Sequence, residues 1–137
     1  MSATSSTPAV QSLTPILIVD AVEPCLAFWR DSLGFVVENE VPGEDGALVF
    51  ASVKKGAVEV MYQSRTSVAA ADPSQAADLV GHSTALFIQL ASLADLDMAE
   101  GALASAPTVK ARHETFYGTT EFYVREPGGN VVGFASR

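Results

Sequence analysis

The spacing of apolar positions changes along the first half of the chain and predicts a strand, a helix and three more strands. Residues 23–33 carry apolar side chains at helical spacing. Pro24 suits the first turn of this helix, and Gly34 suits the position just after its end. The expected strands are the run LTPILIV at 13–19, the segment FVVENEV at 35–41, and the two arms of the hairpin ALVFASVKKGAVEVMYQ at 47–63. The first half is therefore predicted to be βαβββ.

The second half repeats this order after a segment without strand pattern. Residues 64–81 are rich in Ala, Ser and Asp, which is typical of a connector, and a short helix is expected after Pro73. Ser92 and Asp95 have the spacing of a capping box at the start of a second amphipathic helix. The expected strands are TALFIQLASL from residue 84, TVKARHETF from residue 108, and the two arms of the hairpin TEFYVREPGGNVVGFAS from residue 120.

This repetition sets the expected domain organisation. The turn glycines Gly56 and Gly129 mark equivalent hairpins about seventy residues apart, which indicates an internal duplication. A chain of 137 residues with 48% hydrophobic content is enough for one real core. The expected parts are a disordered leader at 1–12 and a single domain at 13–137, composed of module one at 13–63, the connector at 64–81 and module two at 82–137.

The net charge excludes some classes of partner. At −8, with only eight Lys and Arg residues, the chain lacks the basic clusters that bind nucleic acid phosphates, and anionic membranes are disfavoured for the same reason. An acidic surface would attract a cationic small molecule, although it also serves solubility alone. No segment approaches the roughly 20 consecutive apolar residues needed to cross a bilayer.

The cysteine content indicates a reducing compartment. Cys25 is the single cysteine, so an internal disulfide and a cysteine-rich zinc cluster are both excluded. Residues 1–12 have neither the basic start nor the apolar run of a signal peptide. We therefore expect a cytoplasmic protein in which Cys25 packs on the first helix.

Two segments resemble a known family. The run ILIVDAVEPCLAFWRDSLGFVV resembles the opening strand and helix of the vicinal oxygen chelate superfamily, and FYVREPGGNVVGFA is similar to its closing hairpin. That superfamily includes glyoxalase I, extradiol dioxygenases, fosfomycin-resistance enzymes and bleomycin-resistance binding proteins. The resemblance implies an α+β fold in which two tandem βαβββ modules form a cupped, mixed β-sheet around a cavity, usually in a homodimer.

The resemblance also implies four positions from which metal-dependent members hold a divalent ion. They fall here on Thr14, Glu59, Ala85 and Gly133. Only Glu59 is a strong ligand, and one carboxylate aided by a hydroxyl does not hold an ion against water. We therefore predict no metal site. His82 lies three residues before Ala85, and a bulged strand would let it join Glu59; the alternation of Leu86, Ile88 and Leu90 opposes that shift, which would turn the side chain to the other face.

The remaining polar side chains supply candidates for ligand binding. Glu59 interrupts an apolar strand, so on the cavity face it could act as a general base or bind a cationic group, although a half-exposed strand carboxylate would look the same. The candidate catalytic residue is Glu59; the candidate ligand-binding residues are Thr14, Glu59, Met61, His113, Tyr117 and Arg125.

The leading hypothesis is a metal-free protein that binds a small organic molecule, in the manner of members that sequester a toxic or antibiotic compound. The alternative is an enzyme, either a metal-dependent lyase or dioxygenase that uses His82 with Glu59, or a metal-free isomerase or lyase with Glu59 as base. A dimeric scaffold with a filled cup is a third reading. Motifs for serine nucleophiles and phosphate loops are absent from the sequence.

Overall fold

The protein consists of two βαβββ modules in a computed structural model that describes residues 7–74 and 84–137. Module one comprises β1 (Ile16–Val19), α1 (Val22–Leu33), β2 (Val36–Pro42), β3 (Leu48–Lys55) and β4 (Val58–Ser64), and α2 (Arg65–Ala71) follows it. Module two comprises β5 (Ala85–Gln89), α4 (Leu93–Ala102), β6 (Thr108–Glu114), β7 (Thr120–Arg125) and β8 (Val131–Ser136). The predicted α+β fold with tandem modules is confirmed.

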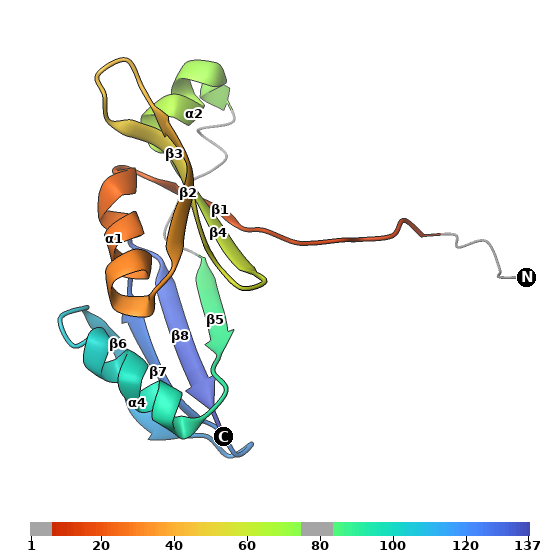
Figure 1. Ribbon diagram of the computed structural model, residues 1–137, viewed down its shortest axis with the longest axis vertical. Helices are drawn as coiled ribbons and strands as arrows, with labels where there is room; N and C mark the ends of the chain where they lie inside the picture. Colours follow the sequence, from red (N-terminus) through yellow and green to blue (C-terminus); the bar gives the residue numbers. More distant parts are fainter. Residues whose placement is uncertain (1–6, 75–83) are drawn as a thin grey trace, which may run out of the picture.

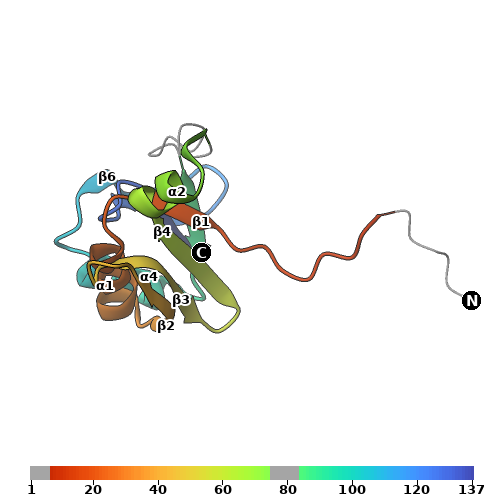
Figure 2. The ribbon, with the colours of Figure 1, turned by 90° about the horizontal axis from the view of Figure 1, so that it is seen from above.

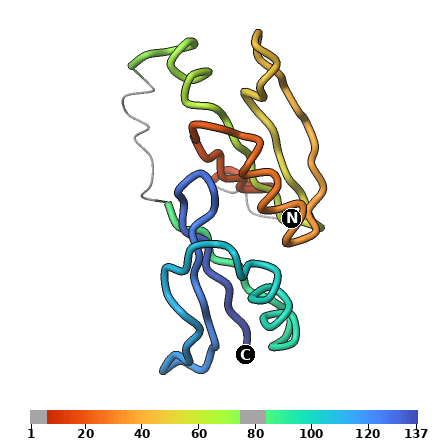
Figure 3. The backbone as a smooth tube through the Cα atoms, turned by 90° about the vertical axis from the view of Figure 1, so that its left-hand side faces the viewer, coloured from red at the N-terminus to blue at the C-terminus, as the bar shows by residue number. Residues whose placement is uncertain are grey.

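Each module forms its own four-stranded mixed sheet. The strand orders are β1-β4-β3-β2 and β5-β8-β7-β6, so the two sheets have the same topology. In each, the first strand runs parallel to the fourth, and the other neighbours are antiparallel. Figures 1 and 3 show the two modules stacked along the long axis of the molecule.

The ends of the helices follow the sequence signals. Gly34 ends α1 with φ of 73°, a left-handed conformation that glycine adopts without steric cost. Ser92 caps α4: its Oγ accepts the Asp95 amide at 3.1 Å and donates to Asp95 Oδ2 at 2.9 Å. Both predicted caps are confirmed.

The connector contains a helix that we did not predict. Residues Arg65–Ala71 form α2, capped by Ser64, whose hydroxyl accepts the Ser67 amide at 3.1 Å. The Ala-rich run has high helix propensity, and Val68 is the buried residue of this helix. The short helix expected after Pro73 lies mostly outside the described residues, as does His82.

The core lies between the helices and one face of each sheet. Leu17, Val60 and Phe134 are buried on this face, and Trp29 and Cys25 of α1 pack against it. Burial, together with the nearby Glu126 carboxylate, raises the pKa of the Cys25 thiol well above its usual range, so this thiol is a packing group, as predicted.

A buried hydrogen-bond chain joins the two modules. Trp29 Nε1 donates to the hydroxyl of Tyr62 at 2.8 Å, and that hydroxyl donates to Glu126 Oε2 at 2.6 Å. Glu126 Oε1 accepts the Asn130 amide at 2.6 Å, which closes the turn before β8. The acidic residue of the EPGGN turn thus ties module two to the core of module one.

The faces away from the helices are open. Figures 1 and 2 show α1 and α4 on one side of the sheets, while the residues before β1 extend away on the other side. Residues 7–13 are exposed and form neither helix nor strand. Among the described residues, no helix is long and apolar enough to cross a membrane.

Candidate functional site

The open face of module two is built by the alternation of side chains along β7. Phe122 and Val124 point into the core, so Glu121 and Tyr123 project from the opposite face of the sheet. Thr119, two residues before Glu121, lies just before β7 and also contacts the Glu121 carboxylate. This face therefore carries a cluster of polar side chains centred on Glu121.

Glu121 is a buried carboxylate held by three hydroxyl groups. Its side chain is 1% exposed. Oε2 accepts hydrogen bonds from Tyr117 at 3.0 Å and from Thr119 at 2.8 Å, and Oε1 accepts one from Tyr123 at 2.9 Å. Among the described residues, no Lys, Arg or His forms a salt bridge with it. The hydrogen bonds to the negative charge therefore come from neutral donors, and His113 adds an electrostatic attraction.

These hydrogen bonds keep the carboxylate ionised. Burial by itself would raise the pKa of Glu121, but the bonds from Thr119, Tyr123 and Tyr117 outweigh it, and the pKa lies below the usual value of a glutamate. Burial and the adjacent carboxylate raise the pKa of Tyr123, so this phenol stays protonated. The cluster is an anion surrounded by phenol and alcohol donors.

Tyr123 also covers the position at which the resemblance implied a metal ligand. It pairs with Gly133 across β7 and β8, and its ring lies directly over that glycine. A Cβ added at Gly133 would collide with ring atoms Cε2 and Cδ2 and lie 3.0 Å from Cζ. Because the Tyr123 hydroxyl donates a hydrogen bond to Glu121, the ring is held in this place.

The open face of module one holds the other group of predicted residues. Glu59 and Met61 project from the face opposite the core, and both are half-buried. Lys54 lies opposite Glu59 in the β3–β4 pair, with no ion pair formed between them. The Met61 amide donates to the Pro15 carbonyl at 2.9 Å, which brings half-buried Thr14 beside this part of β4.

The four positions do not supply a metal-ligand set. The side chain of Ala85 has no atom that could bind a metal, Gly133 is covered by Tyr123, and Thr14 offers only a hydroxyl. Within residues 7–74 and 84–137, no three side chains of the His, Cys, Asp or Glu type lie close enough to hold an ion. A divalent ion needs several such donors, so these residues do not fit one.

Two other predicted ligand-binding residues lie together in module two. His113 and Tyr117 line an open cavity of about 570 Å³ that also includes Glu121 and Tyr123. Arg125 lies elsewhere: its guanidinium donates to the Gly129 carbonyl at 2.6 Å within the β7–β8 turn, and it borders a separate cavity of about 560 Å³ beside α1. The structure thus separates Arg125 from His113 and Tyr117.

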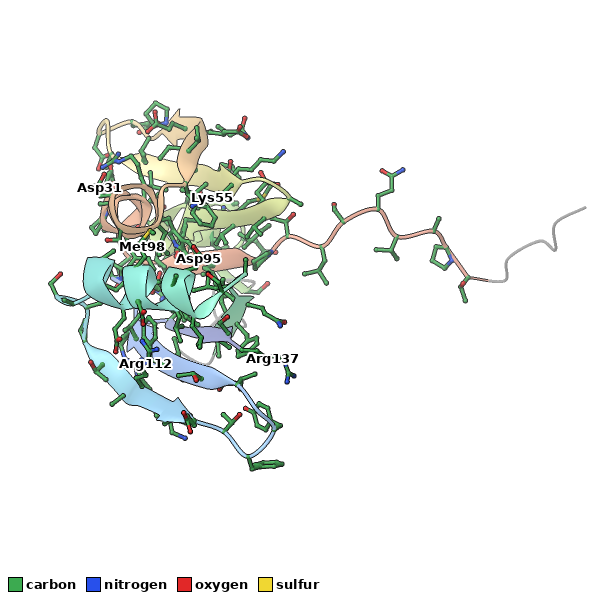
Figure 4. All side chains as sticks on the ribbon, turned by 60° about the horizontal axis from the view of Figure 1, so that its bottom comes forward. Asp31, Lys55, Asp95, Met98, Arg112 and Arg137 are labelled. Atoms are coloured by element: carbon green, nitrogen blue, oxygen red, sulfur yellow. The ribbon has the colours of Figure 1, made fainter. Side chains whose placement is uncertain are left out.

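A further cavity of about 530 Å³ lies between α1 and α4 on the helical side. Figure 4 shows Lys55, Asp95 and Met98 around it. Lys55 Nζ donates to the Leu33 carbonyl at 2.9 Å, so it serves the end of α1. None of the predicted ligand-binding residues lines this cavity.

Sequence reasoning missed the two buried carboxylates. Neither Glu121 nor Glu126 was among the residues predicted from the sequence, and both are almost completely buried. A signal for Glu121 was present: Thr119, Glu121 and Tyr123 alternate with core residues and therefore share one face. No comparable signal marks Glu126, because its partner Tyr62 is distant in the sequence.

Comparisons with known proteins agree with this architecture. The family model described as the Glyoxalase/Bleomycin resistance protein/Dioxygenase superfamily matches residues 10–134. The chain is similar to a lactoylglutathione lyase from Agrobacterium tumefaciens, with 20% identity, coverage of 95% of this chain and 96% of that one, and a TM-score of 0.73. It is also similar to a glyoxalase/bleomycin resistance protein/dioxygenase family enzyme from Burkholderia phytofirmans PsJN, with 17% identity, coverage of 90% and 95%, and a TM-score of 0.72.

TioX from Micromonospora sp. ML1 has the same fold, with 17% identity, coverage of 93% of this chain and 98% of that one, and a TM-score of 0.70. Among curated proteins, no significant sequence match was found. At these identities the structural likeness shows the fold alone, whereas the family model spans most of the sequence. The chain therefore belongs to the glyoxalase/bleomycin resistance protein/dioxygenase superfamily.

Proposed function

We propose that this protein binds a small organic molecule on the open faces of its sheets without a metal ion, and that it sequesters a toxic or antibiotic compound. The description of its superfamily includes bleomycin resistance proteins alongside enzymes. The net charge of −8 favours a cationic compound by electrostatic attraction. The function is therefore binding, with the chemistry of the metal-dependent members lost.

One observation carries this proposal. The ring of Tyr123 fills the space over Gly133, the position at which the resemblance implies a metal ligand. The Tyr123 hydroxyl donates a hydrogen bond to Glu121. Adding a carboxylate at residue 133 would therefore require the ring to move and this hydrogen bond to break. The arrangement favours an aromatic and polar surface at that point over a coordination site.

The open face of module one supplies a second polar region. Glu59 offers a carboxylate beside the thioether of Met61, a combination that suits an organic cation with an apolar part. Lys54 on the neighbouring strand would contact an anionic group of the same ligand. Thr14 adds a hydroxyl at the edge of this region.

The proposal includes a homodimer in the cytoplasm. Ile16, Phe87 and Val36 are large apolar side chains on the open faces, and they are 52%, 57% and 62% exposed in the single chain. Exposed apolar groups of this size are typical of a surface that another molecule covers, and a second copy of the chain would enclose the ligand. The lone buried thiol suits a reducing compartment.

The test combines metal analysis with a ligand screen. Protein purified without chelators is analysed for bound metals, and its thermal denaturation is then recorded with cationic, neutral and anionic organic compounds. We expect far less than one ion per chain, together with stabilisation by a compound at concentrations above its dissociation constant. The variant Glu59→Gln should weaken that stabilisation, whereas Glu44→Gln on the exposed β2–β3 loop changes the net charge equally and should not.

The opposite result supports the enzyme alternative. One ion per chain that is lost in Glu59→Gln would contradict metal-free binding and indicate a lyase or dioxygenase. The variant His82→Gln tests the second ligand of that alternative. His82 lies outside the described residues, so only this experiment addresses it. If the metal-free protein converts a compound and this activity is lost in Glu59→Gln, Glu59 is instead assigned as a general base.

A further inference from the structure

The cavity at the β6–β7 end of module two combines an ionised carboxylate with exposed aromatic rings. Its volume is about 570 Å³, and Glu121, Tyr123 and Tyr117 line it together with Phe116. Phe116 is 100% exposed and Tyr117 is 51% exposed, which is unusual for aromatic side chains. Their rings meet edge to face with centroids 5.0 Å apart.

The hydrogen bonds of Glu121 determine which polar atoms a ligand would meet. The hydroxyl hydrogens of Tyr117 and Tyr123 are directed at the carboxylate, so each phenol oxygen keeps its lone pairs for another partner. The Thr119 hydroxyl is also donated to Glu121. Around Glu121 the cavity therefore presents acceptors and aromatic rings, with a negative charge behind them.

The charges around the cavity offset Glu121 only in part, through an electrostatic attraction from His113. Lys110 and Glu114 both border it from the exposed strand β6, and they balance each other. His113 lies opposite Glu121 in the β6–β7 pair, and its Nδ1 is 2.9 Å from the Ala111 carbonyl. In the neutral ring this contact places the proton on Nδ1 and leaves Nε2 as an acceptor.

One other positive group lies nearby. Figure 4 shows Arg137 at the C-terminal end of the chain, and its guanidinium donates to the Tyr117 carbonyl at 3.3 Å. That contact is with the backbone of the turn, and Arg137 does not line the cavity. It therefore holds the turn that carries Tyr117 without neutralising the carboxylate by an ion pair.

We infer that this cavity binds the ammonium group of an organic cation, with Tyr117 and Phe116 contacting the cation through their rings and Glu121 supplying the opposite charge. An ammonium ion attracts both aromatic faces and carboxylates, and its N–H or polarised C–H groups match a surface of acceptors. The inference rests on the proposed function, because it names the chemical class of ligand and the part of the open surface that recognises it.

The test compares choline with its neutral isostere 3,3-dimethylbutan-1-ol, which has the same shape without the charge. Each is titrated into the full-length, isotopically labelled protein, and chemical shifts of backbone amides and tyrosine rings are followed by NMR. We expect choline to bind about tenfold more tightly than the alcohol, the size of a cation–π contact assisted by a carboxylate. Its shifts should centre on Tyr117, Glu121 and Tyr123, and added salt should weaken choline alone.

Variants separate the charge from the rings. Glu121→Gln keeps the shape of the side chain but removes the charge, and it should weaken choline about tenfold with little effect on the alcohol. Tyr117→Ala removes an exposed ring and should also weaken choline. Glu44→Gln is the matched control, because it removes one negative charge from an exposed loop outside this cavity and should leave both probes unchanged. Circular dichroism confirms that each variant is folded.

Several results would overturn the inference. Equal affinity for choline and the alcohol, unchanged choline binding in folded Glu121→Gln, or preferential binding of acetate at Lys110 and His113 would each do so. If the screen identifies a ligand whose affinity is the same in Glu121→Gln, this inference fails while the proposed binding function stands. If no organic compound binds, both fail.

Discussion

Replacing Gly133 with alanine tests how firmly Tyr123 is held over the position at which the resemblance implies a metal ligand. The backbone of Gly133 is not left-handed, so alanine causes no strain in φ or ψ. In an open strand the change would stabilise the protein by about 0.5–1 kcal/mol, because glycine loses more conformational freedom on folding. Here the new methyl group meets the ring of Tyr123 instead.

The cost follows from the two ways in which the protein can relax. If the ring stays in place, the extra methyl group overpacks the site, which costs about 1–3 kcal/mol. If the ring swings away, the protein loses the Tyr123–Glu121 hydrogen bond, and a bond to a charged group contributes about 1.5–3 kcal/mol. We therefore expect Gly133→Ala to lower the free energy of unfolding by about 1–3 kcal/mol.

A double-mutant cycle identifies the cause. Urea denaturation is measured for Gly133→Ala, Tyr123→Ala and the double variant. With the ring removed, the alanine should be neutral or slightly stabilising, which gives a coupling energy above about 1 kcal/mol. Gly101→Ala in α4 is the matched control: a Cβ there meets nothing within 4 Å, so the variant should gain up to about 1 kcal/mol.

Two results would refute the reasoning. A loss of less than about 0.5 kcal/mol in Gly133→Ala would show that the ring is free to move, since surface changes are usually of that size. An equal loss in the presence and absence of Tyr123 would place the cause elsewhere in β8.

The remaining predictions concern hydrogen bonds, pH and a helix end. Tyr62→Phe should lower the free energy of unfolding by about 2–4 kcal/mol in urea denaturation, because Trp29 and Glu126 lose the buried hydroxyl that joins them; a change near zero would show that water replaces it. The pKa of Glu121 is lower in the folded protein than in the unfolded chain, where it is about 4.3. Ionised Glu121 therefore stabilises the folded state fully above that pH, and this contribution is lost as the pH falls through the folded pKa. Glu121→Gln should therefore flatten the acid limb of a stability–pH curve, and an unchanged limb would contradict this. Gly34→Ala should lower the free energy of unfolding in urea by about 1–2 kcal/mol, because φ at this residue is 73°. No loss would mean that the end of α1 rearranges.

The elements and their order could be predicted because their signals are local. Helix caps at Gly34 and Ser92 depend on residues within a few positions, and the duplicated turns at Gly56 and Gly129 both have positive φ, as hairpin glycines often do. Helix α2 escaped prediction because an Ala-rich run without an apolar stripe also suits a connector.

The candidate site was only partly predictable because it depends on contacts between distant residues. Alternation along β4 correctly placed Glu59 and Met61 on one face. It did not show that Tyr123 would cover Gly133, or that Tyr117 would turn back onto Glu121 across the bend at Gly118. These contacts follow from strand register and turn geometry, which the local pattern leaves open.

The central proposal is that an aromatic ring covers the position at which the resemblance implies an ion ligand, and that the open surface binds organic molecules. Titration of the labelled protein with Mn²⁺, a paramagnetic ion that broadens nearby NMR signals, tests it most directly. We expect weak, unsaturable broadening spread over exposed carboxylates, with no selective loss at Glu59 or Gly133. Saturable broadening of both amides at one equivalent of Mn²⁺ would place an ion between them and contradict the account.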